Sequence, residues 1–90
     1  MSQQNEMSWE PLAKEKYDKM LLMIPLFHRE ITRQVVDKQA LLNAKKRKDA
    51  QVQEEDIIRA FLTEVPKAFY SMMIRLMSRA GFDYERYEGK

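Results

Sequence analysis

The chain has no cysteine, only two glycines and a single histidine among its 90 residues. Without cysteine it can form no disulfide, no cysteine-ligated zinc or iron–sulfur site and no thiol nucleophile. Without a second histidine or a placed carboxylate, His28 forms no structural metal site by itself, and an ordinary surface or interface histidine is the simpler interpretation. No nucleophile–base pair, glycine-rich phosphate loop or zinc motif is present. We therefore predict a protein that is not an enzyme and that holds no metal and no cofactor.

Long hydrophobic runs are also missing. The longest apolar run covers residues 20–25 and continues into Leu26 and Phe27, far short of the roughly 20 residues that span a bilayer. The first six residues are polar and lack the apolar core of a signal peptide. We therefore expect a cytoplasmic protein without a membrane partner.

Charge of one sign is not in excess, because 16 basic residues face 14 acidic ones and the net charge is +2. Such a balance argues only weakly for a nucleic-acid partner. The length allows one domain. We expect a disordered lead over residues 1–8, a single helical domain over 9–81 and a polar, aromatic tail over 82–90, which either folds back on the bundle or stays mobile.

Few helix breakers and many Lys, Glu, Arg, Leu, Met and Ala residues predict an all-α fold, since no segment alternates with period two. Pro11 suits a first helical turn, Pro25 and Pro66 separate helices, and Gly81 suits the position just after a helix. We predict a small bundle of four helices, with a short extended contact at Val52. Their expected ranges are 9–24, 25–46, 53–65 and 66–80.

Apolar residues at spacings of three and four predict the buried stripe of each later helix. On the second helix these are Phe27, Ile31, Val35, Leu41 and Leu42. On the third they are Ile57, Ala60 and Phe61, with Ile58 and Leu62 alongside. On the fourth they are Phe69, Met72 or Met73, Leu76 and Ala80.

Three consecutive carboxylates, Glu54, Glu55 and Asp56, precede the Ile57 stripe. An acid–base pair or metal patch needs carboxylates that converge, whereas successive helix positions point to different faces. Acidic residues in a first turn stabilise a helix through its dipole. We therefore interpret the triplet as a helix start.

A basic run ends the second helix, where cations also favour the dipole. Together with cations nearer the start of that helix, it could contact phosphates or an acidic partner. Asp49 and the acidic triplet lie next to the run and would partly cancel its field. The candidate partner or nucleic-acid surface comprises His28, Arg29, Arg33, Lys45, Lys46, Arg47 and Lys48.

Seven methionines are many for this length, and Met72, Met73 and Met77 share one helix. Such residues fill cores and dimer interfaces, or line adaptable binding surfaces. Our leading hypothesis is a non-catalytic protein-interaction module that forms a homodimer, because short amphipathic helices struggle to bury all their apolar surface alone. The predicted interface comprises Ile31, Val35, Phe69, Met73 and Leu76.

Three motifs resemble a known family: Trp9-Glu10-Pro11-Leu12-Ala13, Ile24-Pro25-Leu26-Phe27-His28-Arg29 and Val52-Gln53-Glu54-Glu55-Asp56-Ile57-Ile58-Arg59-Ala60. They are similar to the small helical C-terminal domain found in light-independent protochlorophyllide reductase, over about residues 9–62. The resemblance implies an accessory role in tetrapyrrole reduction, in which the module covers or positions a pigment held by a partner enzyme.

The order of a short helix, a long helix and an acidic-capped helix also resembles a histone-like arrangement. Such folds often pair into handshake dimers. The analogy adds a second alternative, a nucleic-acid-binding, histone-like protein, although fold alone does not determine function.

Overall fold

The computed structural model describes residues 7–87, and within this range the chain is all-α, as predicted. Its α-helices are α1 (Pro11–Met23), α2 (Leu26–Lys46), α3 (Glu54–Glu64) and α4 (Tyr70–Ala80). Two-residue strands, β1 (Ser8–Trp9) and β2 (Gln51–Val52), and two 3₁₀ turns, η1 (Lys67–Phe69) and η2 (Tyr84–Arg86), complete the elements. The short–long–short order of the first three helices agrees with the prediction.

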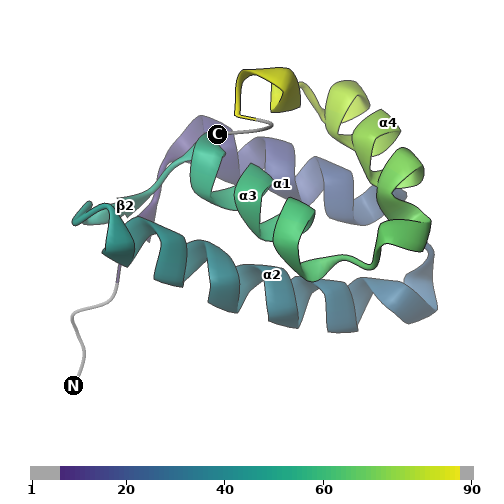
Figure 1. The fold of residues 1–90 in the computed structure, drawn as a ribbon, viewed down its shortest axis with the longest axis horizontal. Coiled ribbons are helices and arrows are strands. Elements are labelled where there is room, and N and C mark those ends of the chain that lie inside the picture. Colours follow the sequence, from purple (N-terminus) through teal and green to yellow (C-terminus); the bar gives the residue numbers. More distant parts are fainter. Residues whose placement is uncertain (1–6, 88–90) are drawn as a thin grey trace.

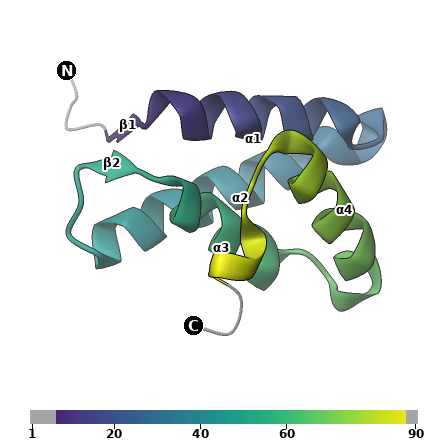
Figure 2. The ribbon, with the colours of Figure 1, turned by 90° about the horizontal axis from the view of Figure 1, so that it is seen from above.

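Helix α2 is the longest element and forms one side of the molecule (Figure 1). Helix α3 makes its most extensive packing against α2, while α4 packs mainly against α1. In the view from above, β1 and β2 lie side by side at one end of the molecule (Figure 2). The helices therefore enclose a core that the two short strands close at one end.

The strand pair ties the start of the chain to the connection between α2 and α3. The two strands are parallel, with Ser8 opposite Gln51 and Trp9 opposite Val52. The extended contact expected at Val52 is confirmed. The expected disordered lead is wrong at its last two residues, because Ser8 is paired and Met7 packs against the core. Residues 1–6 lie outside the described residues.

The helix starts follow the sequence signals closely. In α1, Glu10 is the N-cap, and its Oε1 accepts a hydrogen bond from the backbone N–H of Ala13 at 2.7 Å. In α3, Gln53 and Asp56 form a reciprocal capping box. Such caps satisfy backbone N–H groups that have no partner within the helix. The acidic triplet therefore begins a helix, as its position indicated.

An aromatic cluster anchors α1 in the core. The ring of Tyr17 stacks on Trp9 at a centroid distance of 5.6 Å and meets Phe61 edge-on at 5.8 Å. Its hydroxyl donates a hydrogen bond to Asp37 Oδ1 of α2 at 2.5 Å. Burial, followed by this carboxylate, raises the pKa of Tyr17 above its ordinary value. The hydroxyl therefore stays protonated and serves to join α1 to α2.

The predicted buried stripe of α2 is wrong. The residues of α2 that are fully buried are Val36, Ala40 and Ala44, which are small and recur at spacings of four. The larger residues of the expected stripe face outward instead: Phe27, Ile31, Val35 and Leu42 are exposed, and Leu41 is only partly buried. Small residues on the inner face let α3 approach closely, and its bulky side chains fill the core.

The stripes of α3 and α4 are largely as predicted. Buried residues of α3 include Ile57, Ile58, Ala60 and Phe61. Those of α4 are Met73, Leu76, Met77 and Ala80.

The expected start of the fourth helix is wrong. Pro66 is extended (φ −57°, ψ 145°), and the η1 turn follows before α4 begins at Tyr70. This turn leaves Phe69 46% exposed.

The segment after α4 folds back on the bundle. Gly81 has φ 97°, its N–H donates to the carbonyl of Ser78, and the N–H of Phe82 donates to that of Met77. These two bonds form a Schellman motif, which needs a left-handed residue where glycine fits best. Phe82 is consequently buried, and Tyr84 and Tyr87 pack against the core. Residues 88–90 of the expected tail lie outside the described residues.

Candidate protein-interaction surface

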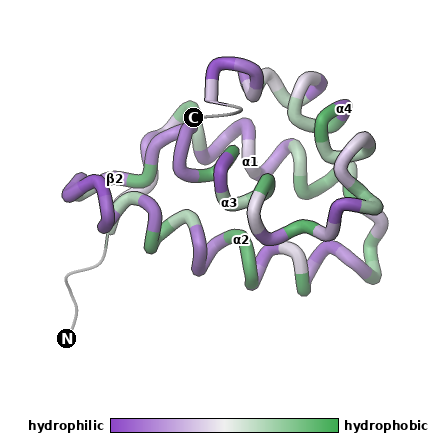
Figure 3. Tube along the Cα trace, viewed as in Figure 1, coloured by the Kyte–Doolittle hydropathy of each residue, from purple (hydrophilic) through white to green (hydrophobic). Residues whose placement is uncertain are grey.

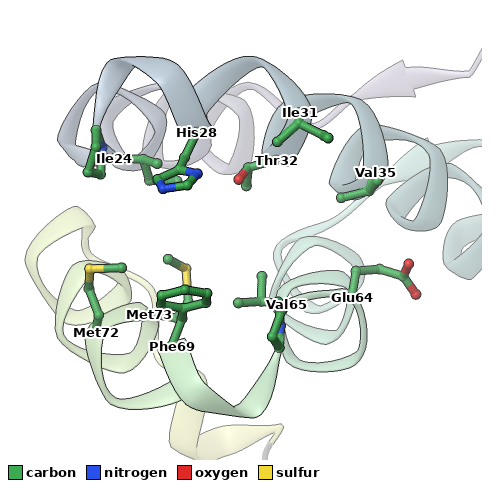
Figure 4. Close-up of a pocket in the computed structure, with 12 residues that line it drawn as sticks. Ile24, His28, Ile31, Thr32, Val35, Glu64, Val65, Phe69, Met72 and Met73 are labelled. Atoms are coloured by element: carbon green, nitrogen blue, oxygen red, sulfur yellow. The ribbon is translucent and has the colours of Figure 1, made fainter.

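An apolar groove of about 300 Å³ opens between the first half of α2 and the α3–α4 connection. Figure 4 shows its two walls facing each other, one carried by α2 and the other by the chain from Glu64 to Met73. Most lining side chains are hydrophobic. They are Ile24, Pro25, His28, Ile31, Thr32, Val35, Glu64, Val65, Pro66, Phe69, Met72 and Met73.

Helix lengths explain why this space is left open. At 1.5 Å per residue, the 21 residues of α2 rise about 32 Å and the 11 residues of α3 only about 16 Å, so α3 covers roughly half of α2. At the uncovered half, Val65 and Pro66 end α3 in an extended conformation, and the η1 turn carries Phe69 to the rim. The two proline corners, Pro25 and Pro66, both line the groove.

Aromatic rings line the mouth of the groove. His28 points across the groove toward Phe69 (Figure 4), and their ring centroids are 6.4 Å apart. The ring of Phe27 lies 4.3 Å from that of His28 and is itself 82% exposed. The carboxylate of Glu64 points away from His28 in the same view. His28 thus belongs to an aromatic rim rather than to a cluster of polar groups.

An apolar stripe continues from the groove along the outward side of α2. We call Phe27, Ile31, Val35 and Leu42 the outer stripe; all four are exposed. Hydrophobic positions recur along the lower, outward edge of α2 in Figure 3. Leu22 and Leu26 add exposed apolar surface at the α1–α2 corner. The groove and the outer stripe share Ile31 and Val35 and therefore form one continuous surface.

Four of the five residues predicted as an interface line this groove: Ile31, Val35, Phe69 and Met73. The fifth, Leu76, does not line it, and both Leu76 and Met73 are buried in the core. The wall contributed by the α3–α4 connection was not predicted as a whole. The two X-Pro corners were the available signal, because each ends one helix and redirects the chain.

The predicted basic surface is divided by internal bonds of its arginines. Arg29 donates to the backbone carbonyls of Leu22 and Ile24 and so caps the end of α1. Arg33 pairs with Glu30 at 2.7 Å. Both arginines are thus already engaged within the chain.

Arg47 is engaged in the same way. It donates to both carboxylate oxygens of Asp56, at 2.6 and 2.9 Å, and to Asp49 at 3.2 Å. The hydrogen bond with Asp56 raises the pKa of Arg47 above its ordinary value. Lys45, Lys46 and Lys48 are exposed at the end of α2. The three arginines of the predicted surface are therefore bonded within the chain, whereas its three lysines are exposed.

The three carboxylates of the acidic triplet pair with cations, and Glu55 and Asp56 share Arg47. Glu54 pairs with Lys16 at 2.8 Å, and Glu55 lies 3.5 Å from Arg59. Asp56 is buried against Arg47. Among residues 7–87, no group of three or more His, Asp or Glu residues is arranged to hold a metal ion. None of the helices in this range is both long and apolar enough to cross a membrane.

No family model, no curated protein and no solved structure matches this chain. The resemblance to the protochlorophyllide reductase domain, and the tetrapyrrole role that it implies, therefore remain predictions from the three motifs. The same holds for nucleic-acid binding, which rests on the basic pattern and on the histone-like order of the helices. The geometry of the groove and the outer stripe is the remaining basis for a function.

Proposed function

We propose that this chain is a non-catalytic protein-interaction module, which binds a protein through the groove and the outer stripe of α2. The observation that carries the proposal is the continuous apolar surface that joins them. Monomeric proteins rarely expose apolar patches larger than a few hundred Å², and larger ones commonly mark interaction sites. On α2 of this 90-residue chain, the large residues Phe27 and Ile31 are exposed, whereas the small residues Ala40 and Ala44 are buried.

The chemistry of the groove supports a protein segment as ligand. Its walls offer aliphatic, aromatic and methionine side chains with few polar groups, as do grooves that accept the apolar face of a helix. Met72 and Met73 have flexible, polarizable side chains that adapt to different partners. The same proposal includes the non-catalytic role and the cytoplasmic location that we expect from the sequence.

Site-specific photo-crosslinking in the producing cell tests this function. A photoreactive phenylalanine derivative replaces Ile31 in one variant and Leu12 in another. The two positions are matched, with 62% and 63% exposure. Leu12 lies in the first turn of α1, and Ile24, which lines the groove, follows the other end of that helix. We expect covalent protein adducts, with another protein or a second copy, from position 31 and not from position 12. Equal or absent protein adducts at both positions would contradict the proposal.

A further inference from the structure

The same surface carries an exposed aromatic side chain beside an apolar groove. From this juxtaposition, and resting on the proposed function, we infer that the partner is a second copy of this chain. In the dimer, the Phe27 ring of each protomer enters the groove of the other. The interface is thus formed twice, around a two-fold axis near the first half of α2.

Self-association follows from having both complementary features on one chain. In a two-fold dimer the same patch faces itself, so residue i of one protomer contacts residue j of its partner, and j contacts i. Phe27 lies next to the groove, with its ring in contact with His28 at the mouth. Two copies brought together at this mouth can therefore exchange their phenylalanine rings reciprocally.

The groove has the size and lining that a phenyl ring requires. An apolar cavity of about 150 Å³ is enough to bind benzene, and this groove has about 300 Å³. His28 and Phe69 offer ring edges and faces to an entering aromatic group. Met72 and Met73 supply sulfur atoms, which make favourable contacts with aromatic rings.

The charges around this surface allow it to face itself. Arg33 and Glu30 neutralise each other, and Arg29 is directed to the carbonyls at the end of α1. Across the groove, Glu64 and Lys67 have opposite signs. By contrast, the exposed lysines near the end of α2 would repel a second copy brought to that end. The two-fold axis is therefore placed near the first half of α2.

The apolar area suits a dimer of moderate stability. At about 200 Å² for each fully exposed large side chain, Leu26, Phe27, Ile31, Val35 and Phe69 together expose on the order of 600 Å² per protomer. A standard protein–protein interface buries about 800 Å² per partner. The patch therefore supplies most of such an interface, and polar rim residues can supply the rest.

Sedimentation equilibrium of the full chain tests the inference. We expect the wild-type chain to dimerise with a Kd below about 1 mM. Phe27→Ala removes both inserted rings and should weaken the dimer by about 100-fold or more. Leu12→Ala, a matched control at an exposed apolar residue away from the groove, should change the Kd less than about threefold. Circular dichroism checks that each variant retains its helices.

A mixing experiment distinguishes reciprocal insertion of Phe27 from non-specific hydrophobic association. Thr32→Glu places a carboxylate in the groove wall, which an entering ring would have to desolvate, so this variant should also fail to dimerise. In an equimolar mixture with Phe27→Ala, the phenylalanine of the Thr32→Glu chain can still enter the intact groove of the other chain. The mixture should therefore form more dimer than either variant alone.

A wild-type chain that stays monomeric up to about 1 mM overturns the inference. So does a Phe27→Ala chain that dimerises as well as the wild type, or a mixture that dimerises no better than its components. These results are distinct from failure of the proposed function. A monomeric chain whose position 31 still crosslinks to a different protein remains an interaction module, but its partner is not a second copy.

Discussion

At the scale of single residues, the carboxylate of Asp56 differs from neighbouring carboxylates in its burial and in its hydrogen-bond partners. It is 1% exposed and accepts hydrogen bonds from Arg47 through two guanidinium nitrogens and from the backbone N–H of Gln53. Along the chain, Lys45 to Lys48 look like four equivalent cations. Only Arg47 has the planar fork that binds a carboxylate through two bonds, and only Asp56 is buried beside it.

Asp56→Asn should lower the free energy of unfolding by about 2–4 kcal/mol, because the partly buried guanidinium of Arg47 loses its shortest ion pair and keeps only the longer ones with Asp49 and Glu55. Urea denaturation monitored by circular dichroism measures this loss. Glu55→Gln is the matched control, since its ion pairs with Arg47 and Arg59 are longer and more exposed, and it should cost less than about 1 kcal/mol. Similar losses in the two variants would show that the buried Asp56–Arg47 ion pair stabilises the fold no more than the more exposed ion pairs of Glu55 do.

At the scale of elements, α2 has two apolar faces, and periodicity alone does not say which one is buried. Val36, Ala40 and Ala44 lie inside, whereas Ile31 and Val35 lie outside at the same helical spacing. The choice depends on what packs against α2. The bulky side chains of α3 already fill the core, so large residues on the inner face of α2 would overpack it.

The end of α2 stores conformational strain. The backbone N–H of Lys48 donates a hydrogen bond to the carbonyl of Lys45. The backbone N–H of Asp49 donates a second one to the carbonyl of Ala44. These bonds form a Schellman motif like the one at Gly81, but the left-handed position here holds Lys48 at φ 60°. A side chain in this conformation costs about 1 kcal/mol or more, a cost that glycine avoids.

Lys48→Gly should therefore stabilise the fold by about 0.5–1 kcal/mol, since relief of the left-handed strain outweighs the added entropy of the unfolded chain. Lys48→Ala removes the same charge but keeps a Cβ, so it should give no such gain. Urea denaturation of the three chains, at a concentration where all have the same oligomeric state, measures the differences. Equal stability of the glycine and alanine variants would rule out strain as the cause.

At the scale of the whole molecule, the groove exists because a long helix is covered by a short one and a proline-directed turn. Ile24 and Phe69 are 45 positions apart in the chain, yet both line it. If the chain forms the proposed dimer, the apolar surface that this creates is buried between two protomers. Its energetic consequence should appear in the thermal stability of the protein, because association stabilises the folded state by mass action.

The midpoint of thermal unfolding should rise with protein concentration, by about 2–4 °C for each tenfold increase over the range where the dimer is populated. Differential scanning calorimetry measures this dependence. Phe27→Ala should have a midpoint that does not change with concentration. A concentration-independent midpoint for the wild-type chain would mean that folding is not coupled to self-association.

The parts that the sequence predicted well are local. Pro11, Pro25 and Gly81 punctuate the helices as expected, and the acidic triplet begins α3. Four of the five residues of the predicted interface line the groove, but that they bind a partner stays a prediction. The start of α4 was misplaced, because an X-Pro corner tells where a helix stops but not whether a 3₁₀ turn intervenes before the next one.

The amino-acid sequence by itself determined the helices of this protein, because caps, prolines and apolar spacing act over a few neighbouring residues. Only the tertiary structure decided which side of α2 is buried, which cation pairs with Asp56 and where the groove opens. These outcomes depend on side chains that are distant in the chain and compete for the same space. A local sequence pattern does not show which of these side chains will occupy the shared space. The packing of the helices decides it.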